Sequence, residues 1–416
     1  MSGRHASIGG AVATFAPVVS TISFYFAFHT LVITALPLTA DDAGIASVAV
    51  TVYMGAGLLF DAAAASVATH RGLRSVVAVS AALMVVIAAA MLTLGDIGWA
   101  LVPVALVLAA CSSLIYIPGL AHYSHLLGAR QARGQRLSVL VQRLGALAAS
   151  VVVGLSLARG VPSALWWAVG GCGALLALGA TRLPAGVVRE AEPRVRLLAA
   201  AHAAWRETAG SRTMLWGLLP AMSMPLVFVL TGSVLPALDG TDAAAAGLGL
   251  IARELVALVC AALLARRGRL RANVEFMVAV VLCAGGALLA LTATSPWQVV
   301  AGVALTGPVV SSAIIVSALN VHAAARHSTR PWACFGAMGM SARLSGLASP
   351  LLLGAAGVWG APSIGAVFVM LLVGLGLGMW PGRQALRDER DSPRGGPTRP
   401  VDHAARLGHR SRSRLS

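Results

Sequence analysis

Ionisable side chains inside long apolar stretches are the residues best suited to chemistry in this sequence. Asp61 lies within an apolar stretch that runs from about residue 46 to residue 68. If that stretch lies in lipid, a charged group there costs a few kcal/mol or more, so it is kept for a function or for a buried partner. A carboxylate in this setting could load and release a proton, or it could form a structural pair between helices. The sequence leaves both possibilities open.

His29 and Glu254 are two lesser candidates for carrying a proton. Histidine changes its charge near neutral pH, although a histidine that is simply hydrogen-bonded in a core has the same appearance in a sequence. Glu254 directly follows Arg253, and neighbouring residues on a helix point about 100° apart. We therefore expect no simple ion pair between these two, with one facing a central cavity and the other a neighbouring helix.

Arg143 and Arg343 stand at matching positions of the sequence, at an offset of 200 residues. They could bind anionic groups of a ligand from two sides at once. They could equally stabilise the protein by pairing with helix ends where its two parts meet, and we favour this structural interpretation.

The stretches that carry these residues are long enough to cross a bilayer. Hydrophobic residues make up 58% of the 416 residues, only 11% are charged, and the mean hydropathy is +0.82. A soluble domain has about a quarter of its residues charged, so much of this surface must face lipid. A helix needs roughly 20 apolar residues to span the bilayer. The stretches that meet this length are 11–36, 46–68, 75–94, 100–122, 137–158, 164–181, 213–236, 244–265, 274–294, 297–319, 333–356 and 361–380.

The arginines indicate which side of the membrane each connection faces. The connections after spans 2, 4, 6, 8 and 10, together with both termini, hold 27 of the 31 basic residues, whereas the opposite side holds only Arg159. Basic residues collect on the cytoplasmic side, so both termini are expected in the cytoplasm, with the protein in the plasma membrane. The same asymmetry explains the net charge of +16 without any nucleic-acid partner.

Two segments are too polar to span. Residues 183–212 form the predicted central cytoplasmic loop, and 194–207 within it could be an amphipathic helix in the lipid interface. Its apolar face would consist of Leu197, Leu198, Ala201 and Trp205. Residues 381–416, rich in Arg, Pro, Gly and Ser, are expected to be a disordered cytoplasmic tail near anionic lipids.

An internal repeat connects the two halves of the chain. Residues 143–154 align with 343–354 at five identical positions of twelve. The loop 65–74 parallels 261–271, with Gly72 and Gly268 at an offset of 196. Matching segments in the same order and at nearly one offset indicate duplication. We therefore predict an all-α integral membrane protein of twelve transmembrane helices in two pseudo-symmetric six-helix bundles, residues 1–182 and 213–380.

The repeated loops resemble those of the major facilitator superfamily, whose pattern between helices 2 and 3 is Gly-x-x-x-Asp-Arg-x-Gly-x-Arg. Two residues of the first loop fit this pattern, while Thr69 and His70 replace the Asp and the first Arg. The resemblance implies cytoplasmic gate loops that contain Gly72, Arg74, Arg266, Gly268 and Arg269. The stretch from Gly145 to Gly154 also resembles the helix 5 motif common among exporters of that family.

The resemblance implies that helices 1, 4, 7 and 10 line a central substrate cavity, and polar residues recur on those spans at helical spacing. For each residue, packing between helices is the alternative to a substrate role. The candidates for the cavity are Tyr25, His29, Tyr116, Ser223, Thr231, Ser317, Asn320, Arg143 and Arg343.

We therefore expect a secondary transporter, and specifically proton-coupled efflux of small hydrophobic or amphiphilic molecules such as drugs or secondary metabolites, by alternating access. Asp61 would carry the proton, with His29 or Glu254 as lesser candidates. One alternative is an uptake permease for a small nutrient or anion, and another is a membrane sensor or scaffold that transports nothing. No enzyme activity, cofactor or metal site is expected, and we expect a monomer whose partners are the substrate, protons and the bilayer.

Overall fold

The computed structural model shows a chain built from long helices. It describes residues 8–40, 43–94, 98–127, 131–183, 197–235, 242–264, 269–328, 330–348, 368–372 and 374–375, and no strand occurs within these ranges. The first six long helices are α1 (Ile8–Leu38), α2 (Ala43–Arg71), α3 (Leu73–Leu94), α4 (Leu101–Leu127), α5 (Gln131–Arg159) and α6 (Ser163–Ala180).

The later helices follow a short linker helix, α7 (Leu197–Gly210). The predicted linker helix thus forms, although residues 194–196 lie outside the described part of the chain. After it come α8 (Arg212–Val229) with its π-helical turn η3 (Leu230–Val234), α10 (Ala243–Leu264), α11 (Arg269–Leu291), α12 (Pro296–Leu305), α13 (Gly307–Ala325) and α14 (Pro331–Gly346).

Ten helical segments of the described residues are long and apolar enough to cross a membrane, so this is a multi-pass membrane protein. The predicted span 297–319 is divided at Thr306, because Pro308 has no N–H to donate to the preceding turn. The span predicted at 333–356 corresponds to α14, and residues 349–367 lie outside the described part. Of the predicted span 361–380, only 368–372 and 374–375 are described, and they are helical.

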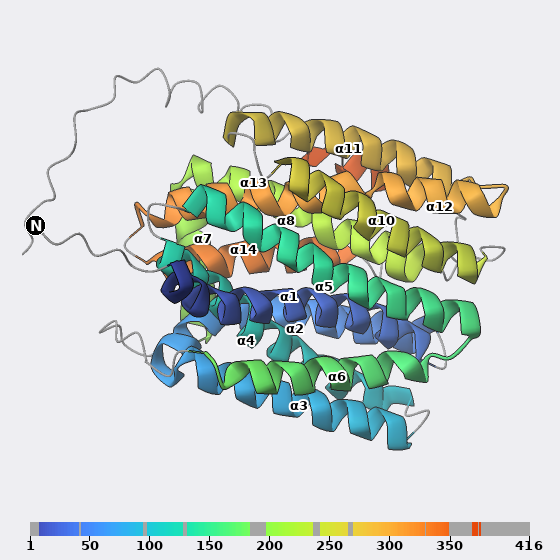
Figure 1. Cartoon of the computed structure of the whole chain (residues 1–416), viewed down its shortest axis with the longest axis horizontal. Coiled ribbons are helices and arrows are strands. Elements are labelled where there is room, and N and C mark those ends of the chain that lie inside the picture. The colour runs from blue at the N-terminus through green and yellow to red at the C-terminus, as the bar shows by residue number, and fades with distance from the viewer. Residues whose placement is uncertain are drawn as a thin grey trace, which may run out of the picture.

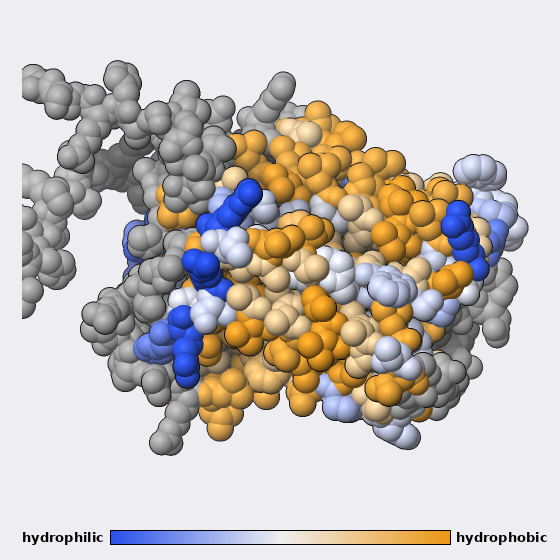
Figure 2. Space-filling view, turned by 60° about the horizontal axis from the view of Figure 1, so that its bottom comes forward, coloured by the Kyte–Doolittle hydropathy of each residue, from blue (hydrophilic) through white to orange (hydrophobic). Residues whose placement is uncertain are grey.

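The surface agrees with a membrane environment. Apolar residues cover the middle of the face drawn in Figure 2, and the most hydrophilic residues lie toward its two ends. α3 and α6 pack against each other at the edge of the bundle. They expose large apolar side chains such as Val86 (64% exposed) and Trp167 (71% exposed), which cost little in lipid but would be costly in water.

The long helices run nearly parallel and gather into two groups (Figure 1). We call α1–α6 the first bundle and α8 with α10–α14 the second bundle. The bundles meet chiefly where α5 packs on α10 and where α2 packs on α14. The linker helix α7 touches α2 of the first bundle as well as α8 and α14 of the second. The segment boundaries at 182, 212 and 380 stay predictions.

Glycines allow the closest approach between the bundles. A Cβ at Gly247 of α10 would lie 2.8 Å from the Cα of Gly154 of α5, and one at Gly154 would lie 3.0 Å from the carbonyl oxygen of Gly247. Gly145 packs in a similar way against the backbone of Ser23 in α1. The glycines of the exporter-like motif therefore serve helix packing, as small residues do in membrane interfaces.

We expect Gly154→Leu to destabilise the protein by about 1–3 kcal/mol, because the α5–α10 contact has no room for a side chain. The matched control is Gly171→Leu in α6, where a Cβ meets nothing within 4 Å. Thermal unfolding in detergent compares the two variants. Equal midpoints for both would contradict the proposed close contact.

Candidate functional site

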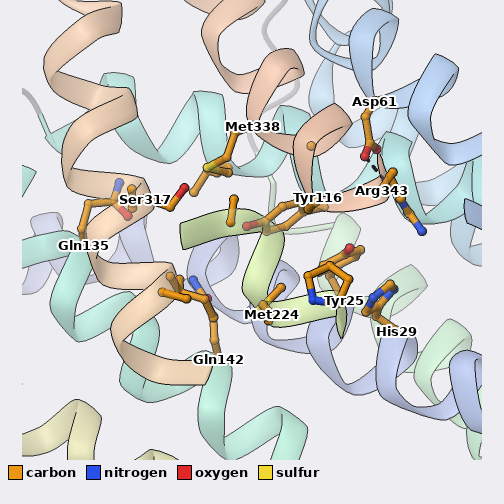
Figure 3. Close-up of a pocket in the computed structure, with 18 of the residues that line it drawn as sticks. Tyr25, His29, Asp61, Tyr116, Gln135, Gln142, Met224, Ser317, Met338 and Arg343 are labelled. Atoms are coloured by element: carbon orange, nitrogen blue, oxygen red, sulfur yellow. Dashed lines mark hydrogen bonds and ion pairs between the residues drawn. The ribbon is translucent and has the colours of Figure 1, made fainter. Parts of the chain in front are cut away.

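A cavity lies between the two bundles, bounded by α1, α2, α4 and α5 on one side and by α8, α13 and α14 on the other. Its volume of about 40 Å³ is enough for only a few water molecules. A substrate would therefore have to widen it. Six of the predicted site residues line it, and Figure 3 shows them converging from both bundles: Tyr25, His29, Asp61, Tyr116, Ser317 and Arg343.

Aromatic rings form one wall of the cavity. The rings of Tyr25 and Tyr116 stack with centroids 4.3 Å apart and an interplanar angle of 15°. The ring of His29 also stacks on that of Tyr25, with centroids 5.5 Å apart and an interplanar angle of 19°. These residues come from α1 and α4, so the predicted helical spacing does bring them to one face. Such a wall offers flat surfaces to a ring-shaped ligand.

An ion pair between the bundles forms another wall. Nε of Arg343 in α14 donates to Oδ2 of Asp61 in α2 at 3.3 Å, and both side chains are only 4% exposed. The guanidinium also lies over the ring of Tyr53, 4.7 Å from its centroid. A glycine is required here, because a Cβ at Gly339 would stand 2.7 Å from that carboxylate oxygen.

Hydrogen bonds link this ion pair to His29. Nη2 of Arg343 donates to Oγ of Ser112 at 2.5 Å, and the hydroxyl of Tyr53 donates to the same oxygen at 3.3 Å. The Tyr53 hydroxyl also bonds Nδ1 of His29 at 2.8 Å. The two predicted proton carriers Asp61 and His29 thus belong to one continuous network. Tyr53 was missed in the sequence because it lies on α2, whereas the resemblance placed the cavity on spans 1, 4, 7 and 10.

A second buried charge cluster joins the bundles at α5 and α10. Nη1 of Arg143 donates to Oε2 of Glu254 at 3.1 Å. Nε and Nη2 of Arg253 both reach Oε1 of Glu254, at 3.0 and 2.7 Å. All three side chains are fully buried. Arg143 also lies over the ring of Phe26, and Arg253 lies over that of Phe228.

This cluster corrects the expectation that Arg253 and Glu254 do not pair. The long arginine side chain folds back along its own helix, and in the absence of water a nearby carboxylate is its best partner. Neither residue lines the cavity, and neither does Arg143. Arg143 and Arg343, the repeated pair, each reach a carboxylate of the opposite bundle, rather than the helix ends that we expected.

The other predicted cavity residues lie in helix packing. The hydroxyls of Ser223 and Thr231 bond carbonyl oxygens of their own turns, at 2.7 Å each, and Thr231 also accepts from Arg253. Asn320 is buried. None of these three lines the cavity. Of the predicted gate loops, Gly72 has a φ of 81°, which suits glycine in the turn between α2 and α3.

The rest of the gate-loop set is only partly described. Arg74 is exposed near the start of α3. Arg266 and Gly268 lie outside the described residues, and Arg269 begins α11.

Two glutamines of α5 also line the cavity, and they were not predicted from the sequence. Gln135 and Gln142 both line it (Figure 3). Nε2 of Gln142 donates to Ser138 at 2.7 Å, whereas its Oε1 has no hydrogen-bond partner among the described residues. Oγ of Ser317, in α13 of the second bundle, also lacks one within the described chain. The spacing of seven between the glutamines was the available signal, because it places both on one helix face.

A histidine connects the bundles at the end of the molecule where α7 lies. His322 of α13 contacts Ser124 of α4 through Nδ1 and Gln135 of α5 through Nε2. Its ring packs edge-on to Phe335, with centroids 5.0 Å apart. These contacts tie α4 and α5 of the first bundle to α13 of the second. The sequence offered only a histidine in the last turn of a span, which is a weak signal.

Comparison of the structure with solved structures gives the class of fold. The nucleoside transporter NupG superposes with a TM-score of 0.61 at 14% identity, over 89% of this chain and 99% of that one. The Escherichia coli fucose:proton symporter FucP gives a TM-score of 0.59 at 14% identity, over 90% and 99%. No family model matches the chain, and no curated protein matches its sequence.

The chain shares the fold of these two transporters, which agrees with the resemblance of its loop motifs to the major facilitator superfamily. The predicted all-α membrane fold class is confirmed, and the ten apolar helical segments among the described residues are consistent with a bundle of twelve. Likeness at this level of identity shows the fold alone.

We expect Glu254→Gln to destabilise the protein by about 3–5 kcal/mol, because it leaves two buried arginines without a counter-charge. Asp242→Asn is the control, since this exposed residue only caps α10 and asparagine caps equally well. Unfolding in a denaturing detergent series measures both. Wild-type stability for Glu254→Gln would show that the cluster contributes nothing.

Proposed function

We propose that the protein is a proton-coupled secondary transporter, which moves a small neutral molecule through the central cavity by alternating access. The observation that carries this proposal is the Asp61–Arg343 pair, which is buried, lines the cavity and joins the two bundles. A carboxylate so placed can sense a proton, a substrate and the contact between the bundles together.

The coupling follows from electrostatics. Protonation of Asp61 removes its negative charge and so weakens the attraction to Arg343 across the α2–α14 contact. The bundles can then separate at this contact and open the cavity to one side. Return of the proton to water restores the carboxylate and with it the ion pair. Glu254 is less suited to this role, because it is bound to two arginines and does not line the cavity.

The hydrogen-bond network can carry a proton between His29 and Ser112, and it reaches Asp61 only through Arg343. His29 and the hydroxyls of Tyr53 and Ser112 can each donate and accept. They connect His29, in the second half of α1, with Arg343 of the ion pair. Arginine has no acceptor, so Arg343 orients Ser112 and holds Asp61 but does not itself pass the proton.

The cavity favours a neutral ligand with a ring and hydrogen-bonding groups. Its arginine and its carboxylate are paired with each other, so little free charge remains for an ionic substrate. The aromatic wall of Tyr25 and Tyr116 suits a ring-shaped ligand. Oε1 of Gln142 and Oγ of Ser317, which have no hydrogen-bond partner among the described residues, suit donors on a ligand. A nucleoside and fucose, transported by the proteins of similar fold, have such features.

Import in symport with protons fits these observations better than efflux does. Efflux was expected from the motif of Gly145 and Gly154. Both glycines serve close helix packing, and an importer needs such packing as much as an exporter does. Fold neighbours include a fucose:proton symporter. Uptake of an anion is less favoured, because Arg143 and Arg343 both already have carboxylate partners. A sensor or scaffold without transport predicts no flux at all.

The orientation belongs to the same proposal. We place the protein in the plasma membrane as a monomer, with both termini and the α7 linker in the cytoplasm, on the strength of the arginine distribution.

Purified protein in liposomes tests the proposal. With an inward proton gradient, we expect accumulation of labelled uridine or fucose, and no proton-driven movement of a cationic dye such as ethidium. Asp61→Asn should lose stimulation by the gradient yet keep exchange of substrate across the membrane, because the cavity remains. Asp242→Asn should behave as wild type. Proton-driven dye efflux would favour the exporter, and normal stimulation in Asp61→Asn would remove this residue from coupling.

A further inference from the structure

A second pocket lies apart from the central cavity, beside the linker helix. Its walls are α7, the start of α8, the end of α13 and the start of α14, and its volume is about 630 Å³. It shares no lining residue with the central cavity. This end of the molecule is the arginine-rich end, which the positive-inside rule places in the cytoplasm.

The lining of this pocket suits an anion. Arg206 of α7 and Arg330 before α14 bring two permanent positive charges, and His327 adds an imidazole ring. A single carboxylate, Glu207, opposes them. Hydroxyl groups complete the polar lining, from Ser211, Thr213 and Ser328. Guanidinium forks and hydroxyls together are the donors that bind phosphate oxygens best.

The linker helix also places this pocket at the lipid interface. Ala200, Ala203 and Ala204 are buried against the bundles. On the outer side, Leu198 is 76% exposed and Trp205 is 67% exposed. Exposed tryptophan and leucine on an in-plane helix are typical of contact with the headgroup region of a bilayer. Trp205 directly precedes Arg206, so the apolar contact and the basic pocket adjoin.

We propose that this pocket binds a phosphate group, carried by an anionic phospholipid or by a soluble phosphate compound. The phosphate would bridge Arg206 of the linker and Arg330 of the second bundle. Because α7 also contacts α2 of the first bundle, the bound group would fix the linker at the place where the two bundles meet. This site is independent of the substrate and proton chemistry of the central cavity.

Ligand titrations on the purified full chain in a neutral detergent test the proposal. The probes are short-chain phosphatidylglycerol, short-chain phosphatidylcholine and inorganic phosphate, followed by tryptophan fluorescence and thermal unfolding. We expect saturable binding of phosphatidylglycerol. Binding of inorganic phosphate as well would identify a site for soluble phosphate compounds, and binding of phosphatidylglycerol alone would identify a headgroup site. No saturable binding of any probe would overturn the proposal.

Variants locate the binding. Arg206→Gln with Arg330→Gln should weaken binding by at least about tenfold, because two charge-assisted contacts are lost. The control is Arg182→Gln, an exposed arginine after α6 outside the pocket, which should bind as wild type. If the double variant is not recovered folded, each single substitution is measured with its lysine counterpart, which keeps the charge and should keep part of the affinity. Unchanged affinity in the glutamine variants would overturn the assignment.

Discussion

A charge buried in the membrane needs a partner, and this requirement organises the interface between the two bundles. Asp61 pairs with Arg343, and Glu254 pairs with Arg143 and Arg253. The pair of Asp61 with Arg343 and the pair of Glu254 with Arg143 each join the first bundle to the second. Removing one member of such a pair leaves a charge that neither lipid nor apolar side chains can solvate. Separating the bundles at these contacts would therefore cost free energy, because it would leave buried charges without partners.

The two charged contacts differ in what surrounds them, and this difference assigns their roles. The Glu254 cluster is fully buried, carries an excess arginine and is flanked by Phe26 and Phe228, so it is suited to a permanent contact. The pair of Asp61 and Arg343 lines the cavity and joins a hydrogen-bond network. Glycines allow close packing at both contacts, since Gly154 meets Gly247 between α5 and α10 and Gly339 lies against Asp61 between α2 and α14. Because only the pair of Asp61 and Arg343 lines the cavity, movement between the bundles is expected at α2 and α14 rather than at α5 and α10.

Much of the fold could be predicted from the sequence, because span length and hydropathy are set by the thickness of the bilayer. The repeat also identified Arg143 and Arg343, since a membrane arginine is costly wherever it occurs. Their partners could not be predicted, because helix spacing gives a direction on one helix and says nothing of which helix lies opposite. For the same reason no ion pair was expected between Arg253 and Glu254. The arginine side chain is long enough to reach the neighbouring carboxylate, which the directions of the two residues on the helix did not reveal. Gln142 was missed because an uncharged amide in a span is a weak signal. Only the structure reveals that its Oε1 has no hydrogen-bond partner in the described part of the chain.

The central claim is that Asp61 takes up and releases the transported proton while it exchanges its contact with Arg343. Infrared difference spectroscopy of the protein in lipid measures this directly, because a protonated carboxyl group has a C=O stretching band that a carboxylate lacks. On acidification, or on addition of a transported substrate, we predict such a band, shifted by isotope labelling of aspartate and missing when residue 61 is asparagine. A spectrum without the band, or one that keeps it in the asparagine variant, would contradict this account.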